Sequence, residues 1–507
     1  MGAEDSGTAN KKSVWLSDTA LLIHIALATV IVHWITGHQY GFQRDELATL
    51  EDSRHLDWGF VAYPPITPLF GRLSLMLFGT SLAGFRLFAA AAEAIAVVLT
   101  GLMAREMGGG RGAQLIAAAA AIPFCIAGGA MMQYVSFDYL FWVLSAYFVV
   151  KLLKSDDPRW WLAIGAAVGF GLESKYTMGF FALGIALATL LTDARRYFKS
   201  KWLWYGVGLS ILIFLPNLIW QARNHFISLD FLQHIHVRDV HMGRAKKFLP
   251  EQLKLALGGV FLALAGIYFA LFSRDGKRFR MLGWMYLIPL ALFMIAKGRA
   301  YYLAAAYPML YAAGSVWLEQ MLSRAGSAAR NAIRVLLWTL LIADAAIMAS
   351  ITLPITAADS PWATRAMKIN GDFCEEIGWP ELVETIAKVR DSLPPEDRAH
   401  LGILAGNYGE AGAVNLYGPQ YGLPSAISGV NSFWQKGYGD PPPQTLIVLG
   451  RNLDQIQDSF ASCALAAHTW NRFGVLNEET REHPDIFVCR TLRKPWPEYW
   501  KTARHFG

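Results

Sequence analysis

About eleven long apolar runs constrain the fold of this chain more than any other feature of its sequence. Each run has about 16 to 22 residues, the length that a helix needs to cross the hydrocarbon core of a membrane. The chain is 54% hydrophobic and 17% charged, whereas soluble domains carry about 25% charged residues. We therefore expect a polytopic α-helical membrane protein. The runs lie near residues 15–36, 83–104, 113–131, 138–153, 160–173, 177–192, 202–220, 252–272, 281–296, 301–321 and 335–354.

The distribution of lysine and arginine predicts the orientation of these spans. Lys11 and Lys12 precede the first run, and the other basic clusters fall in every second loop. The positive-inside rule makes that side cytoplasmic, so an odd number of spans leaves the C-terminal part outside. The first run has no small-residue cleavage site after it, and we expect it to be retained as a span. The predicted parts are a transmembrane domain over 1–354 with outer loops 37–82 and 221–251, and an outer domain over 355–507.

The net charge of +6 is modest, and the basic residues are dispersed among short loops. A nucleic-acid-binding protein concentrates its basic residues in one patch. Nucleic acid is therefore excluded as the partner.

The C-terminal part has more charge and shorter apolar runs than the rest of the chain. A helix over 381–393 alternates with strands over 401–405, 445–449 and 486–489, which predicts a small α/β domain. The section from Gly406 to Trp434 is rich in Gly, Asn and Tyr, and it contains Asn407 and Glu410. Such residues suit contact with a sugar, and they also suit ordinary turns.

The first outer loop places two adjacent acids, Asp45 and Glu46, just beyond the first span. Short helices are predicted over 45–54 and 66–78, lying along the membrane surface. A carboxylate at a partly dehydrated interface suits general-base work, with Asp45 as the base and Glu46 either assisting it or pairing with Arg44. The alternative is the start of a solvated helix, where acids favour the helix dipole.

Two further residues on the predicted outer side attract attention. Asp138 opens the fourth span, where it would be either a second catalytic acid or a helix cap. Lys175 lies between two short apolar runs, on a side where positive charge is otherwise sparse. Either it pairs with Glu173, or it binds the phosphate of an anionic lipid.

The outer turn Lys297-Gly-Arg-Ala-Tyr-Tyr also runs against the positive-inside trend. Lys297 and Arg299 flank a glycine, which allows the backbone to approach a phosphate closely. Tyr301 and Tyr302 follow as candidate substrate contacts. The alternative is snorkelling of the basic side chains within an interfacial aromatic belt.

The loop 221–251 carries four histidines and several basic residues, Arg244 among them. His234 and His236 are spaced like metal ligands, but no carboxylate or thiolate completes a familiar set. We therefore expect no metal or other cofactor; a divalent metal ion is the one alternative, and nothing in the sequence demonstrates it. A mobile basic loop that grips a phosphate or covers a site is the simpler interpretation.

The four cysteines show no metal-ligand spacing. Cys125 lies in an apolar run and is expected in the core. A Cys463–Cys489 disulfide is compatible with an oxidising compartment, and Cys374 competes as a partner.

Candidate bases and candidate phosphate-binding cations thus fall on one side of a membrane. That arrangement fits transfer of a group from a lipid-linked phosphate to a hydroxyl or amine acceptor. A transporter or flippase of lipid-linked sugars would also gather cations around a phosphate. Transporters, however, usually show internal repeats and broken spans in corresponding positions, which this sequence lacks.

Four motifs resemble the bacterial branch of the protein O-mannosyltransferase and lipid A aminoarabinose transferase family. They are Arg44-Asp45-Glu46-Leu47, Tyr63-Pro64-Pro65, Ser174-Lys175-Tyr176-Thr177 and Lys297-Gly-Arg-Ala-Tyr-Tyr-Leu with Tyr307-Pro308. The resemblance covers residues 15–320 and implies a GT-C fold glycosyltransferase of the bacterial inner membrane. Its donor would be a polyprenyl-phosphate sugar, and its acceptor a lipid A, polysaccharide, glycolipid or protein of the envelope.

The resemblance also implies roles for single residues. Asp45 takes the place of the family's catalytic acid, and Asp138 that of a second acid. Lys175 matches a lysine that contacts the donor phosphate, and Lys297 and Arg299 fall where the family has basic residues near the donor. Tyr63, however, stands where aminoarabinose transferases have a lysine, so one phosphate contact of those enzymes is not expected here, and Tyr63 is a candidate substrate contact instead.

Overall fold

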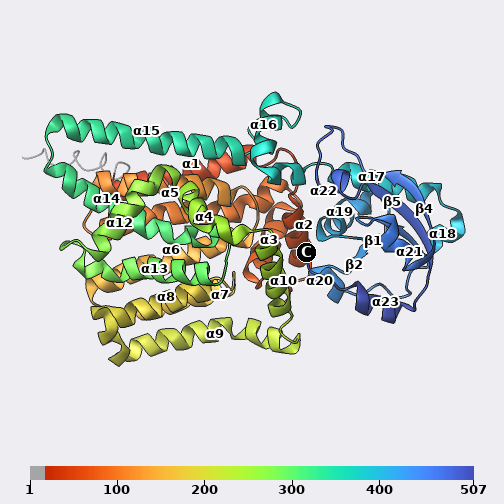
Figure 1. The fold of residues 1–507 in the computed structure, drawn as a ribbon, viewed down its shortest axis with the longest axis horizontal. Helices are drawn as coiled ribbons and strands as arrows, with labels where there is room; N and C mark the ends of the chain where they lie inside the picture. Colours follow the sequence, from red (N-terminus) through yellow and green to blue (C-terminus); the bar gives the residue numbers. More distant parts are fainter. Residues whose placement is uncertain (1–16) are drawn as a thin grey trace, which may run out of the picture.

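A computed structural model describes residues 17–507, which form a bundle of helices and a smaller sheet-containing domain (Figure 1). The first helix, α1, covers Asp18–Thr36. Lys11 and Lys12, on which the predicted cytoplasmic N-terminus rests, lie outside the described residues.

The helical part contains seven helices among residues 17–507 that are long and apolar enough to cross a membrane, or up to nine if each of two bent pairs is one span. The chain is thus a multi-pass membrane protein. The seven helices are α1, α4 (Leu82–Glu106), α5 (Arg111–Gly129), α6 (Tyr134–Ser155), α9 (Lys201–Arg223), η4 with α13 (Lys277–Ile295) and α15 (Ser327–Thr352). The bent pairs are α8 (Met178–Leu191) with η1 (Asp193–Lys199), and α11 (Phe248–Leu255) with the η3–α12 stretch (Leu257–Leu271).

Helices occupy every one of the predicted spans, but not all of them have full length. The fifth span is α7 (Trp160–Leu172), with 13 residues, and the tenth is α14 (Tyr307–Ser323), with 17 residues, which follows the 3-10 helix η5 (Ala300–Ala306). Counting them as crossings would restore the predicted eleven, and that count stays a prediction.

Short helices connect the bundle to the second domain. The two helices predicted in the first outer loop are present as α2 (Arg44–Arg54) and α3 (Ile66–Phe78). The segment predicted to be a mobile loop, 221–251, is instead helical, with α10 (Ile227–His241) followed by η2 (Arg244–Lys247). Figure 1 shows α2, α3 and α10 at the junction of the two parts.

The predicted small α/β domain is present, with a five-stranded sheet in the order β2-β1-β3-β5-β4. Strands β1, β2 and β3 are parallel, and β5 and β4 add antiparallel at one edge. The strands are β1 (Leu401–Ala405), β2 (Ala426–Ser428), β3 (Thr445–Val448), β4 (Phe460–His468) and β5 (Asp485–Leu492). The helices around them are α16 (Pro361–Ile369), η6 (Gly371–Glu376), α17 (Trp379–Ser392), α18 (Pro395–Ala399), α19 (Tyr408–Tyr417), η7 (Gly418–Tyr421), α20 (Asn431–Gln435), α21 (Leu453–Gln457), α22 (Glu478–Arg481) and α23 (Trp496–Ala503).

One disulfide links the two antiparallel edge strands. It joins Cys463 of β4 to Cys489 of β5, which are directly paired in the ladder. Cys125 is buried in the bundle, and Cys374 is a free thiol. The structure therefore selects the Cys463–Cys489 pairing over either pairing with Cys374.

The close approach of α7 and α9 shows how glycine sets the packing of the bundle. A Cβ added to Gly206 of α9 would lie 2.2 Å from the carbonyl oxygen of Trp161, and one on Gly165 would lie 2.0 Å from the carbonyl oxygen of Gly206. Membrane helices have little hydrophobic driving force between them, so such small-residue contacts supply much of their packing energy.

We predict that Gly206→Ala lowers the apparent Tm of the detergent-purified protein by a few degrees, because overpacking of this kind costs about 1–3 kcal/mol. The matched control is Gly208→Ala on the same helix, where an added Cβ meets nothing within 4 Å. That control should leave the apparent Tm unchanged or raise it slightly. An equal fall in both variants would show that the contact between α7 and α9 is not the cause.

Candidate functional site

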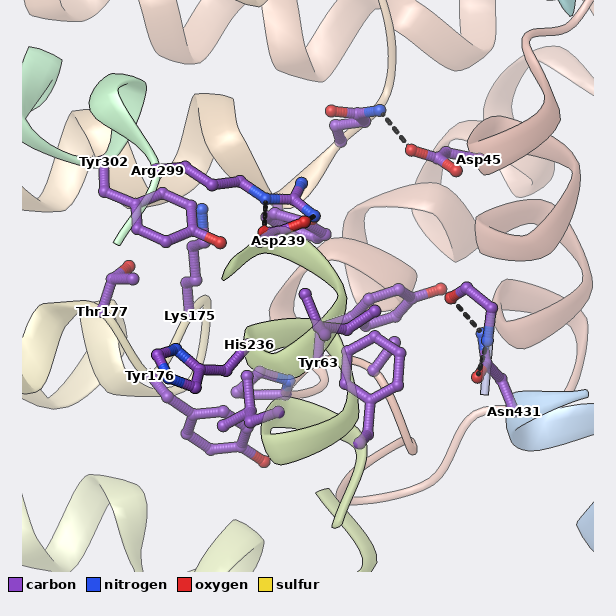
Figure 2. A pocket seen from close by; sticks show the side chains of 18 of the residues that line it. Asp45, Tyr63, Lys175, Tyr176, Thr177, His236, Asp239, Arg299, Tyr302 and Asn431 are labelled. Atoms are coloured by element: carbon purple, nitrogen blue, oxygen red, sulfur yellow. Dashed lines mark hydrogen bonds and ion pairs between the residues drawn. The ribbon is translucent and has the colours of Figure 1, made fainter. Parts of the chain in front are cut away.

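A cavity of about 430 Å³ lies at the junction of the bundle and the α/β domain (Figure 2). Its walls come from α2, from the 62–64 segment, from α10, from the Lys175–Thr177 turn, and from residues 293–302. The α/β domain completes it with Tyr408 and Asn431–Phe433. Figure 2 shows Lys175, Tyr302 and Arg299 with its partner Asp239 on one side and Asp45 on the other, so the candidate base faces the lysine across the cavity.

Helix α2 supplies the acidic wall. A capping box of Gln43 and Glu46 starts the helix, and Asp45 lies in its first turn. Asp45, Thr49 and Asp52 all line the cavity, as their spacing along one helix face allows. One oxygen of Asp45 accepts a hydrogen bond of 2.8 Å from the Gln133 amide, and the other accepts one of 2.8 Å from the Tyr408 hydroxyl. The base candidate is therefore held from both domains.

Glu46 points away from the cavity, so the expectation that it assists Asp45 and the expectation that it pairs with Arg44 are both wrong. Its side chain is fully buried and forms an ion pair of 2.6 Å with Arg86 of α4. It also accepts a hydrogen bond of 2.8 Å from the backbone N–H of Met132. Glu46 therefore neither lines the cavity beside Asp45 nor pairs with Arg44, because its acceptor sites are used to fix α2 against the bundle.

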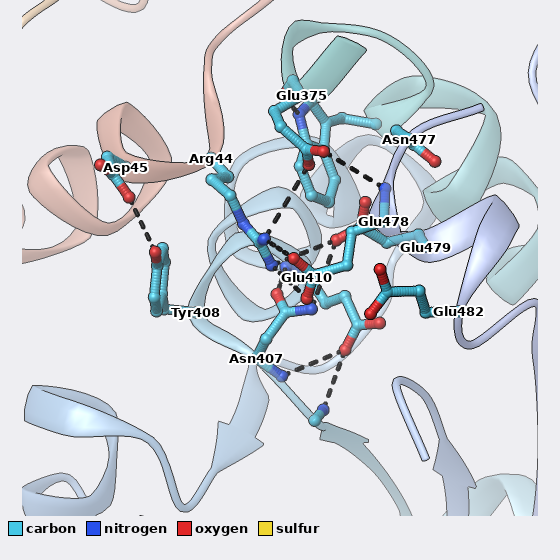
Figure 3. Close-up of polar contacts among 12 residues, drawn as sticks. Arg44, Asp45, Glu375, Asn407, Tyr408, Glu410, Asn477, Glu478, Glu479 and Glu482 are labelled. Carbon is cyan, nitrogen blue, oxygen red and sulfur yellow. Dashed lines mark hydrogen bonds and ion pairs between the residues drawn. The ribbon is translucent and has the colours of Figure 1, made fainter. Parts of the chain in front are cut away.

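Arg44 reaches in the opposite direction, into the α/β domain (Figure 3). Its guanidinium forms an ion pair with Glu478 and lies 3.5 Å from Glu479 and 3.9 Å from Glu375. Burial raises the pKa of Glu375 to about 7, even though Arg44 opposes that shift. This cluster of carboxylates around one arginine attaches the start of α2 to the second domain.

Lys175 lies in the wall opposite Asp45. Its ammonium lies over the rings of Tyr302, Tyr134 and Tyr301, at 4.1, 4.7 and 4.9 Å from their centroids. Burial lowers the pKa of Lys175. Within residues 17–507 it forms no ion pair, so the alternative pairing with Glu173 is absent. The buried Asp138 carboxylate interacts with it through space, without an ion pair, so the ammonium held by the aromatic faces can still receive an anion in the cavity.

The other predicted cations divide into two groups. Arg299 donates to Asp239 of α10 through Nε at 2.5 Å and Nη2 at 3.2 Å, and Arg244 contacts the same carboxylate at 3.0 Å. Arg244 does not line the cavity, whereas Lys297 does. Asp239 thus engages Arg299 and Arg244, and it lies 3.9 Å from Arg238, so its single negative charge leaves this wall net positive. Lys175 and Lys297 are the two lysines of the wall.

Asp138 lies behind the cavity wall. It is buried and accepts hydrogen bonds from the Trp142 indole at 3.0 Å and the Thr177 hydroxyl at 2.9 Å. Thr177 lines the cavity and Asp138 does not. Helix α6 begins at Tyr134, so Asp138 is not its cap either. Its contact instead fixes the turn that carries Lys175.

Asn407 and Glu410, predicted as substrate contacts, form the capping box of α19. Glu410 is buried and accepts hydrogen bonds from the backbone of Gly406 and Asn407, and neither side chain lines the cavity. The interpretation of this section as turn chemistry holds for both of them. Tyr408, between them, is the residue that reaches the site.

Tyr63 lines the cavity, as predicted for a substrate contact. Tyr301 does not line it but packs behind two lining residues, Lys175 and Tyr302. The Tyr63 hydroxyl donates a hydrogen bond of 2.7 Å to Asp52. Burial raises the pKa of Asp52 to about 7. Four further residues of the site were not predicted from the sequence: Asp52, Gln133, Asp239 and Tyr408. Only Asp52 carried a local signal, because it shares one face of α2 with Asp45.

The histidines of α10 do not assemble a metal site. His236 lines the cavity, while the His234 ring lies 5.9 Å from that of Phe506. Over residues 17–507 no group of three or more His, Cys, Asp or Glu side chains could hold a metal ion.

Comparisons with known proteins place this geometry in a known fold. Residues 62–220 match the family described as dolichyl-phosphate-mannose-protein mannosyltransferase. The structure of ArnT from Cupriavidus metallidurans bound to undecaprenyl phosphate matches with a TM-score of 0.56 at 16% identity, over 95% of this chain and 98% of that one. Its apo state matches with a TM-score of 0.57 at 15% identity, over 94% and 98%. No curated protein matches in sequence.

The family match includes Tyr63, Asp138 and Lys175 but ends before Lys297. The match to ArnT extends over nearly the whole chain, α/β domain included. The resemblance predicted from the motifs is thus confirmed. The chain has the GT-C fold of ArnT, and its residues 62–220 are similar to the dolichyl-phosphate-mannose-protein mannosyltransferase family.

Proposed function

We propose that this protein is a membrane glycosyltransferase that moves a sugar from a polyprenyl-phosphate donor to an acceptor of the cell envelope. One observation carries the proposal: Asp45 and the unpaired Lys175 line opposite walls of a single cavity. A transferase of this kind needs a base at the acceptor and a cation at the departing phosphate. The cavity offers both.

Asp45 is the base in this proposal. The acceptor hydroxyl attacks C1 of the donor sugar while its proton passes to the Asp45 carboxylate. The bond between C1 and the phosphate oxygen breaks, and the polyprenyl phosphate leaves with the electron pair. A single displacement from the face opposite the leaving group inverts the configuration at C1.

Lys175 and Lys297 hold the leaving phosphate. Neither forms an ion pair within the described part of the chain, so neither must break one to bind an anion. Arg299 and Arg244, expected to share this role, are occupied by Asp239. Arg299 attaches the 297–302 segment, which closes the phosphate end of the cavity, to α10, and Arg244 attaches η2 to the same carboxylate of α10.

The fold and the wall that carries Lys175 and Lys297 together support a polyprenyl-phosphate donor. ArnT, whose fold the chain shares, has been captured with undecaprenyl phosphate. A lipid-linked phosphate would reach Lys175 from the bundle, since the turn that carries it joins α7 and α8. The acceptor would enter from the α/β domain, beside Tyr408 and Asn431.

The proposed setting is the bacterial inner membrane. The distribution of basic residues favours a cytoplasmic N-terminus and a periplasmic α/β domain. Acceptors on that side include lipid A, polysaccharide, glycolipids and proteins.

We predict that Asp45→Asn abolishes sugar transfer in membranes that retain normal protein levels, because the amide cannot take the acceptor proton. Radiolabelled sugar incorporated from a polyprenyl-phosphate donor measures this activity. The control is Asp230→Asn, an exposed carboxylate of α10 that does not line the cavity, and it should transfer normally. Wild-type turnover by the Asp45 variant would exclude it as the base, and lipid-linked sugar crossing vesicles without glycoside formation would indicate a flippase.

Lys175→Met should raise the KM for the donor at least about tenfold, because a charge-assisted contact to phosphate contributes about 1.5–3 kcal/mol. Lys254→Met is the control, an exposed lysine of α11 outside the cavity. The KM for the acceptor should stay the same in both variants. An unchanged donor KM in the Lys175 variant would remove this residue from the phosphate site.

Tyr408→Phe should lower kcat about tenfold and leave the donor KM unchanged, because loss of a hydrogen bond to a charged group costs about 1.5–3 kcal/mol. Tyr408 is a positioning residue in this proposal, since it acts through Asp45. The matched control is Tyr438→Phe in the same domain, whose ring stacks on Trp496. An equal effect of both changes would point to the stability of the domain rather than to the orientation of Asp45.

A further inference from the structure

A second cavity, of about 850 Å³, lies at the opposite end of two helices that lead away from the Asp45 cavity. Helix α8 starts beside the Lys175–Thr177 turn and ends at Leu191, which lines the second cavity. Helix α13 starts at Arg280, which also lines it, and ends at Ile295, close to Lys297. The sequence predicts this end of the bundle to face the cytoplasm.

The backbone around this cavity is tightly fixed. The chain bends by 102° where α8 gives way to η1, and the Thr192 side chain caps the new helix by accepting from the N–H of Ala194. On the opposite wall, a Cβ on Gly276 would lie 1.9 Å from the carbonyl oxygen of Phe269. Helices α8 and α13 meet where a Cβ on Gly184 would lie 2.8 Å from Pro289. The cavity is therefore shaped by packed backbone.

Positive charge predominates in the lining. It contains five cations, Arg195, Arg196, Lys277, Arg278 and Arg280, against the carboxylates of Asp156 and Asp193. Two of the cations are already engaged, since Arg196 pairs with Asp156 and Arg278 donates to the carbonyl oxygen of Leu153. Arg195, Lys277 and Arg280 form no ion pair and no side-chain hydrogen bond within residues 17–507.

Apolar side chains stand directly beside these cations. Phe272 is 70% exposed and Leu191 is 56% exposed, and Trp284 and Leu287 extend the same surface along α13. A soluble phosphate needs only the cations. This cavity, at the end of membrane helices, combines three free cations with an apolar surface, and an amphiphile has the two complementary parts. Its phosphate headgroup would bind the cations, and its acyl chain would lie along the aromatic rings.

The positive-inside rule alone does not explain this arrangement. Arg324 lies in the loop before α15, and Arg334 lies near the start of that helix. Both satisfy the positive-inside rule, yet they line neither of the two cavities. Basic residues that only set the orientation need no cavity between them.

We propose that this cavity, which we call the basic groove, is a binding site for the phosphate headgroup of an anionic membrane lipid. Arg195, Lys277 and Arg280 bind the phosphate, and Phe272 and Trp284 contact the first part of an acyl chain. The proposal does not depend on sugar transfer, because it uses none of the residues of the Asp45 cavity.

The test compares lipid retention by native mass spectrometry of the purified protein with phosphatidylglycerol or phosphatidylcholine. The groove variant is Arg195→Gln with Arg280→Gln, and the control is Arg324→Gln with Arg334→Gln. Loss of two phosphate-binding cations should weaken phosphatidylglycerol binding roughly thirtyfold in the groove variant only. Size-exclusion elution and the lipid-free Tm check that both variants are folded.

Phe272→Ser distinguishes a lipid from a free phosphate. It should weaken phosphatidylglycerol binding, and inorganic phosphate at millimolar concentration should fail to displace the lipid from the wild-type protein. Displacement by inorganic phosphate would overturn the lipid assignment. Equal binding of phosphatidylcholine, or equal losses in the groove and control variants, would overturn the site itself.

Discussion

The candidate site depends on a buried ion pair between Arg86 and Glu46, which fixes the start of α2. Both side chains are at most 3% exposed and lie 2.6 Å apart, and Glu376 of the second domain joins them at 3.4 Å. Removing one partner of such a pair typically costs about 3–5 kcal/mol, because a buried charge is left uncompensated. This constraint determines where Asp45 stands, since the two acids are neighbours in one helical turn. Glu46 provides the anchor, and Asp45 faces the cavity.

The same separation of roles recurs among the cations. Asp239 binds Arg299 and Arg244 and so turns two of the expected phosphate ligands into structural contacts. Lys175 forms no ion pair within residues 17–507, because three tyrosine rings surround its ammonium and the Asp138 carboxylate behind the wall acts on it only through space. A charged side chain can be kept without a counterion in a cavity when aromatic faces replace part of its hydration. The site thus keeps its free charges at the two places where the proposed chemistry needs them.

Sequence patterns predicted the features that depend on neighbouring residues. Hydrophobic length located the helices of the predicted spans, and local patterns found α2, α3, β1, β3 and β5, whereas α10 was predicted as a mobile loop. Strand β4 was missed because it lies at a sheet edge with most of its side chains exposed. The contact of Tyr408 with Asp45 joins residues 363 positions apart, and that of Arg299 with Asp239 joins residues 60 apart. Pairings at such distances arise only from the fold, whereas the Asn407–Glu410 capping box carried a local signal.

A cryo-electron microscopy structure of the Asp45→Asn variant with a polyprenyl-phosphate sugar bound would test the proposed mechanism most directly. The donor phosphate should lie between Lys175 and Lys297, with C1 of the sugar facing position 45 across the cavity. The Arg299–Asp239 pair should remain closed in that complex. A phosphate bound away from both lysines, or a sugar directed away from α2, would contradict the proposed mechanism.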